Sequence, residues 1–141
     1  MPSFSNDALA PLIFYALWAI VVVLFLGVSR AGVMSRDKRS VETFKPYGDT
    51  EQLDAISRAH MNTIENLPVF AIVYMAALWT DAPSPTILIG WSCLSARVLQ
   101  SIIHISSRGA NATRARALMQ FVQLISFIWL GVAALRAAYA G

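Results

Sequence analysis

The sequence predicts an all-α integral membrane protein, built as a bundle of four transmembrane helices. Of its 141 residues, 57% are hydrophobic and only 13% are charged, whereas about a quarter of the residues of a soluble domain are charged. The chain also contains four apolar stretches long enough to span a hydrocarbon core of about 30 Å. Its lone cysteine, Cys93, excludes an internal disulfide framework.

The four helices are expected over residues 9–29, 54–80, 85–106 and 113–138 of a single domain. The first stretch is uncharged between Leu9 and Val28, and no Lys or Arg precedes it. A signal peptide would begin with a basic region, so this stretch is interpreted as a retained helix. The second stretch is polar before it becomes apolar at Leu67, and two prolines, Pro83 and Pro85, separate it from the third.

The third stretch contains Arg97 and His104, and a polar loop over residues 106–111 follows it. Thr113 is a candidate N-cap for the fourth helix. The connection between the first two helices, residues 29–53, is long, charged and expected to be solvated and partly irregular.

The distribution of basic residues predicts the orientation in the membrane. Lys and Arg collect in the first loop and around the third loop, at Arg30, Arg36, Lys38, Arg39, Lys45, Arg108, Arg114 and Arg116. Because cytoplasmic loops are enriched in Lys and Arg, these two loops should face the cytoplasm and both termini the other side. The same residues form no stripe on a polar helix, so nucleic-acid binding is not expected.

Polar residues inside the helices recur at helical spacing, which places each set on one helix face. The three sets are Arg58, Asn62 and Glu65; Arg97, Gln100, Ser101 and His104; and Arg116, Gln120 and Gln123. A charge at the centre of a membrane helix costs roughly 2.5–3.5 kcal/mol, so these side chains need partners.

Two interpretations of these stripes remain open. In the first, several arginines line a cleft that binds a small ligand with more than one carboxylate, which a guanidinium matches well. In the second, the stripes form an internal network in which Glu65 neutralises Arg58 or Arg97, and Asn62 and Gln100 complete it. Arg114 and Arg116 could each also be anchors that extend to the membrane interface.

The stretch from Arg58 to Phe70, RAHMNTIENLPVF, resembles the signature of the MAPEG family, the membrane-associated proteins in eicosanoid and glutathione metabolism. The shared pattern is Arg, a pair of residues ending in His or Gln, then Asn, Glu, Pro and Phe. The resemblance extends over the whole chain, through its length, its four apolar segments and its basic first loop, and it is greatest to bacterial members.

This resemblance implies a homotrimer that binds glutathione, as co-substrate, between subunits at the cytoplasmic side. It also implies transferase, peroxidase or isomerase chemistry on a lipophilic small molecule. The positions implied at the glutathione site are Arg30, Arg58, His60, Asn62, Glu65, Arg97, Gln100 and His104. An arginine early in the fourth helix, Arg114 or Arg116, is implied near the sulfur as the catalytic group.

The sequence departs from the family pattern at several positions. Gln100 and His104 stand where well-studied relatives have tyrosine, and the serine that follows the helix-four arginine in some relatives is absent. The arginine expected at the end of the first helix could be Arg30 or Arg36, with Arg30 preferred.

The leading hypothesis is a glutathione-dependent membrane transferase in a bacterial inner membrane. Arg30, Arg58 and Arg97 would hold carboxylates, and Glu65 would pair with the ammonium or orient an arginine. Arg114 or Arg116 would lower the pKa of the thiol. A non-catalytic trimeric scaffold and a small transporter are the alternatives, with lipid as a further partner and no metal site. The first helix has no acidic residue, which argues against a small cation exporter.

Overall fold

Four long helices make up most of the computed structural model, which describes residues 7–45, 48–82 and 85–140. They are α1 (Ala10–Asp37), α2 (Glu51–Trp79), α3 (Thr86–Ser106) and α4 (Ala110–Ala140), with a short 3-10 helix, η1 (Val41–Thr43), between α1 and α2. Each of the four is long and apolar enough to cross a membrane, and the described residues contain no strand. The predicted fold class is therefore confirmed.

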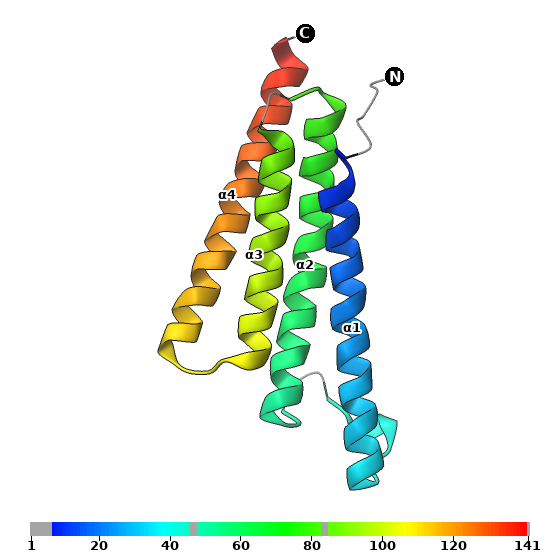
Figure 1. Ribbon diagram of the computed structural model, residues 1–141. Coiled ribbons are helices and arrows are strands. Elements are labelled where there is room, and N and C mark those ends of the chain that lie inside the picture. Colours follow the sequence, from blue (N-terminus) through cyan, green and yellow to red (C-terminus); the bar gives the residue numbers. More distant parts are fainter. Residues whose placement is uncertain (1–6, 46–47, 83–84, 141) are drawn as a thin grey trace.

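Successive helices run in opposite directions (Figure 1). The ends of α1 and α4 nearest the termini lie at one end of the bundle, with the α2–α3 connection. The α1–α2 and α3–α4 loops lie together at the other end, so the two basic loops share one side. Helices α2 and α3 each contact all three other helices, so these two form the centre of the chain.

Three helix boundaries differ from the sequence prediction by three residues or more, namely the end of α1 and the starts of α2 and α4. Helix α1 continues from the predicted end at residue 29 to Asp37, and it ends only where Lys38 adopts a left-handed conformation with φ 52°. Helix α2 begins at Glu51 rather than residue 54, because Thr50 is its N-cap and accepts a hydrogen bond from the Leu53 amide at 3.2 Å. Of the predicted turn between α2 and α3, residues 83–84 lie outside the described residues.

The prediction that Thr113 caps α4 is wrong. Helix α4 begins at Ala110, directly after Gly109, whose φ of 93° is a conformation that favours glycine. Thr113 lies in the first turn, where its hydroxyl donates a hydrogen bond to the Gly109 carbonyl at 3.2 Å. Its side chain therefore satisfies a carbonyl oxygen rather than a free amide.

The core in the half of the bundle nearest the termini is aromatic. Phe70 packs between Tyr15 and Tyr74, with ring centroids 5.1 and 5.2 Å apart, and contacts Phe127 of α4 at 6.2 Å. Gly90 allows α3 to approach α2 closely, because a Cβ at this position would lie 2.6 Å from the Tyr74 ring. The polar stripes of α3 and α4, residues 97–104 and 116–123, lie in the halves of these helices that adjoin the α3–α4 loop.

Candidate functional site

The polar stripe of α3 faces the interior of the bundle. Arg97 is completely buried, and its Nε donates a hydrogen bond to the Tyr15 hydroxyl of α1 at 2.9 Å. Its Nη2 is buried and has no hydrogen-bond partner among the described residues. The partner of Arg97 is thus a phenol rather than Glu65, so the predicted neutralisation by Glu65 does not occur within the described part of the chain.

The stripes of α3 and α4 meet through their glutamines. Gln100 Nε2 donates to the Arg116 carbonyl at 3.0 Å and to Gln120 Oε1 at 3.3 Å. Gln123 Nε2 donates back to Gln100 Oε1 at 3.0 Å, while its own buried Oε1 has no partner within residues 7–45, 48–82 and 85–140. Gln100 therefore fixes the start of α4, and Arg116 with it, against α3.

Ser101 connects α3 to the first two helices. It accepts a hydrogen bond from Trp18 Nε1 of α1 at 3.2 Å, and its hydroxyl lies 3.5 Å from that of Thr63 in α2. Sequence reasoning missed Trp18, Thr63 and Tyr15 as members of this network. The available signal was a tyrosine and a tryptophan in an uncharged apolar segment, because buried Tyr and Trp need partners for their polar atoms.

Asn62 and His104 form the direct polar link between the α2 and α3 stripes. Asn62 Nδ2 lies 3.2 Å from His104 Nε2, and the Asn62 carbonyl accepts a hydrogen bond from Asn66 Nδ2 at 2.8 Å. Both Asn62 and His104 are half-buried. This pair therefore lies between the buried polar residues of α3 and the exposed polar residues of α2.

The other two members of the α2 stripe point away from the bundle. Arg58 and Glu65 are both exposed, and neither makes a hydrogen bond or an ion pair with another described residue. They are separated by about 10 Å along the helix axis, since seven residues rise 1.5 Å each. The outer face of α2 thus carries a cation and an anion two turns apart, with the half-buried Asn62 between them.

Arg30 and His60 lie together where α1 packs against α2, close enough for their charges to interact. Arg36, the alternative to Arg30 for this position, is exposed and pairs with the neighbouring Asp37 at 3.1 Å. Arg30 Nη2 donates to the Lys45 carbonyl at 3.5 Å. Arg30 Nε and His60 Nδ1 are buried and have no hydrogen-bond partner in the described chain.

The two arginines at the start of α4 differ in their surroundings. Arg116 is half-buried, and it donates to Thr113 Oγ1 at 2.9 Å and to the Ser107 carbonyl at 3.4 Å. It is also near enough to His104 for their charges to interact. Arg114 is exposed and forms no hydrogen bond with any residue that the structure describes.

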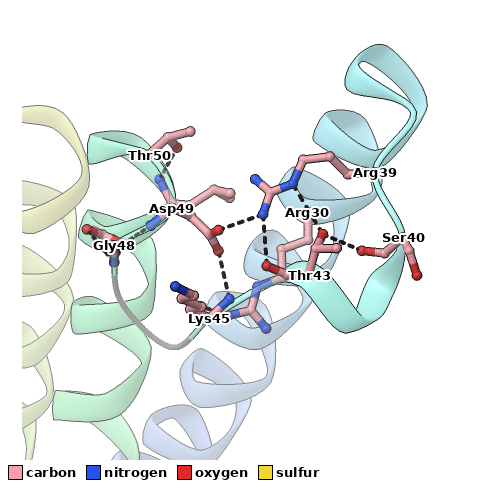
Figure 2. Close-up of polar contacts among 10 residues, drawn as sticks. Arg30, Arg39, Ser40, Thr43, Lys45, Gly48, Asp49 and Thr50 are labelled. Atoms are coloured by element: carbon pink, nitrogen blue, oxygen red, sulfur yellow. Dashed lines mark hydrogen bonds and ion pairs between the residues drawn. The ribbon is translucent and has the colours of Figure 1, made fainter.

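One ion pair connects the two described parts of the α1–α2 loop, on either side of residues 46–47 (Figure 2). Arg39 Nη2 donates to Asp49 Oδ1 at 2.8 Å and to the Thr43 carbonyl at 2.9 Å, and the Lys45 amide donates to Asp49 Oδ2 at 3.0 Å. The hydrogen bond from Arg39 lowers the pKa of Asp49 below its ordinary value. The loop carries Phe44, whose ring lies 5.9 Å from the Arg30 guanidinium.

The model of the MAPEG family matches residues 8–136, which is nearly the whole chain. No curated protein matches the sequence. The signature stretch that carries the resemblance, from Arg58 to Phe70, lies within α2 and includes the outward-facing polar residues described above. The chain therefore belongs to the MAPEG family, the membrane-associated proteins in eicosanoid and glutathione metabolism.

Proposed function

We propose that the protein is a glutathione-dependent membrane transferase that presents the glutathione thiolate to a lipophilic electrophile. The observation that carries this proposal is the outer face of α2, where Arg58 and Glu65 lie exposed without a charged partner in the described chain. Glutathione has two carboxylates and one ammonium, so it supplies counter-charges for both residues. Family membership supports the same ligand.

The active form is proposed to be a homotrimer with glutathione between neighbouring subunits. A charge that faces hydrocarbon costs roughly 2.5–3.5 kcal/mol even on insertion-based scales, so Arg58 and Glu65 are unsuited to a lipid-facing surface. A second subunit packed on this face would exclude lipid and leave a polar cleft. With the basic loops in the cytoplasm of a bacterial inner membrane, this cleft would open toward the cytoplasm.

Within this cleft, arginines bind carboxylates and glutamate binds the ammonium. Arg58 and Arg30 would hold carboxylate groups of glutathione, Glu65 would hold its ammonium, and Asn62 would donate an amide hydrogen bond. Behind these residues, Arg97 and the half-buried His60 each have a buried nitrogen without a partner in the described chain, and they would complete the site together with the half-buried His104. Gln100 would contribute by holding Arg116 in place.

Arg116 is the proposed catalytic residue, and Arg114 the proposed interface anchor. Arg116 is held toward α3 by the Gln100 hydrogen bond to its carbonyl, and it lies in the first two turns of α4. The guanidinium and the positive helix end would both stabilise a thiolate. The thiol proton would leave to water, and the sulfur would then form a bond to the electrophilic carbon as the leaving group departs.

The test is ultraviolet difference absorbance of the thiolate when glutathione is added to the purified protein in detergent. A saturable thiolate band is expected at a pH below the pKa of free glutathione. S-methylglutathione, which has no ionisable thiol, should compete for the site and give no band. A non-catalytic scaffold predicts no saturable signal, and that result would refute the proposal.

The oligomeric state is tested by native mass spectrometry in detergent. A trimer that retains glutathione is expected. If monomers or dimers are the only species, the site cannot lie between the subunits of a trimer. Glutathione binding by a monomer would then assign the outer face of α2 a different role.

A further inference from the structure

A groove of about 450 Å³ runs along α4 in the half of the bundle nearest the termini. The proposed glutathione site lies in the other half, so the groove is a separate feature. Its lining residues recur at intervals of three and four, which places them on one helix face. They are Ile125, Ile128, Trp129, Val132, Ala133 and Arg136.

The length of the groove matches one leaflet of a bilayer. Eleven residues separate Ile125 from Arg136, which corresponds to about 16 Å along a helix. Half of a hydrocarbon core of about 30 Å is about 15 Å. Arg136 directly follows the uncharged stretch 117–135, so it lies at the level where hydrocarbon gives way to lipid headgroups.

Arg136 is an isolated cation at this end of the molecule. It is exposed and has no hydrogen bond or ion pair with another residue in the described ranges. Arg136 is the single Lys or Arg among the described residues near this end, which are residues 7–9, 79–82, 85–86 and 136–140. An apolar groove of leaflet length therefore ends at one unpaired guanidinium.

We propose that this groove binds one molecule of an anionic phospholipid from the leaflet nearest the termini. The guanidinium of Arg136 would hold the lipid phosphate, because its donors match phosphate oxygens in a bidentate geometry. One acyl chain would lie along Ile128, Val132 and the half-buried Trp129. The volume of the groove lies within the range of about 300–1,000 Å³ that is common for ligand sites.

Trp129 provides a direct readout of lipid in the groove. The full-length protein is reconstituted in vesicles that contain phosphatidylglycerol or phosphatidylcholine with brominated acyl chains, which quench tryptophan fluorescence on contact. Trp129→Phe in the same vesicles reports the contribution of the other tryptophans, which is subtracted. We expect Trp129 to be quenched more strongly by brominated phosphatidylglycerol at equal lipid fraction.

Arg136→Gln should reduce this preference about fivefold, which corresponds to the roughly 1 kcal/mol that one basic residue contributes at an anionic membrane surface. Lys38→Gln is the matched control, because it removes one exposed cation at the opposite end and should leave the preference unchanged. Equal quenching by both lipids, or equal effects of the two substitutions, would overturn the proposal. Complete protection of Trp129 from either lipid would instead assign the groove to a second copy of the chain and also overturn it.

Discussion

Arg39 and Asp49 in the α1–α2 loop form an ion pair at 2.8 Å, and the loop folds around it. In the helices the charges are arranged differently. Arg97 has a tyrosine hydroxyl as its partner, and Glu65 has no partner among the residues described. The ion pairs among the described residues are thus located in and next to the loops, at the end where water can reach them.

The charges that gain least from an ion pair are therefore paired, and the charges that would gain most are not. A solvent-exposed ion pair contributes about 0–1 kcal/mol, because water already screens both charges. A charge within a membrane helix costs several times more when it has no partner. If the charged side chains of the helices served only to stabilise the fold, they would be expected to form ion pairs with one another within the chain. Arg58 and Glu65 have no ionic partner among the described residues, and the proposed ligand and second subunit would supply that compensation.

The largest effect is expected for Glu65→Gln, which removes the anion from the outer face of α2. Glutathione binding should weaken by about 3–5 kcal/mol, the usual cost of breaking a buried charged pair. The melting temperature of the glutathione-free protein should change little, because Glu65 is exposed and makes no hydrogen bond within the described chain. Isothermal titration calorimetry in detergent measures the affinity.

Glu51→Gln is the matched control, since it alters an exposed acid on the same helix whose partner is Arg108 in the loop. This substitution should leave the affinity for glutathione unchanged. If Glu65→Gln also binds normally, or if both variants lose affinity equally, the outer face of α2 is not the glutathione site.

The next largest effect is expected for the buried hydrogen bond between Arg97 and Tyr15. Tyr15→Phe removes the hydroxyl that accepts the Arg97 Nε–H, and it leaves a second unsatisfied donor on a buried cation. A lost hydrogen bond to a charged group costs roughly 1.5–3 kcal/mol. The melting temperature in detergent should therefore fall. Tyr139→Phe, at an exposed position near the end of α4, should have no effect. Equal melting temperatures for Tyr15→Phe and the wild type would show that this bond does not stabilise the fold.

The comparison also explains which parts of the molecule were predictable from sequence. Helical spacing correctly groups Arg97, Gln100 and Ser101 on one face, because the 3.6-residue period fixes relative direction. The same period does not fix how a helix is rotated within the bundle. Glu65 therefore faces outward and Arg97 inward, although both belong to polar stripes of the same form. Four membrane helices were predictable because length and hydropathy alone define them.

Boundaries were harder to predict because local backbone geometry decides them. Helix α1 extends to Asp37, since arginine and serine are compatible with a helix and only the left-handed Lys38 ends it. The roles of Tyr15 and Trp18 were missed because both lie in an otherwise apolar span, where neither spacing nor charge distinguishes them. Their partners lie more than 80 residues away in the sequence, so only the packed structure identifies them.

The two arginines of α4 provide a smaller and more specific test. Two helical steps place their side chains about 200° apart, so a single thiolate can be approached by only one of them. Arg116→Ala should raise the pKa of bound glutathione by about one unit, equivalent to about 1.4 kcal/mol, because the half-buried guanidinium near His104 is lost. Arg114→Ala should leave that pKa unchanged. Absorbance titration of the bound thiolate measures both variants, and a shift confined to Arg114→Ala would reverse the assignment.

The smallest effect is expected in the loop, where the compensated charges are solvated. The hydrogen bond from Arg39 lowers the pKa of Asp49 in the folded protein, so the order that depends on this carboxylate is present at neutral pH. It should be lost as the pH falls through the lowered folded value, below the ordinary 3.8. Hydrogen exchange of the Lys45 amide, which donates to Asp49, reports this order after correction for the intrinsic exchange rate.

In Asp49→Asn, protection of the Lys45 amide should be weaker at neutral pH and should no longer change on acidification. Asp37→Asn removes an exposed carboxylate at the end of α1 and should leave the wild-type profile of the Lys45 amide intact. Glutathione affinity at neutral pH should be nearly the same in both variants, because the Arg39–Asp49 pair compensates itself. A large loss of affinity in Asp49→Asn would mean that the loop pair belongs to the same ligand site as the helix charges, and the distinction between the two regions would then be wrong.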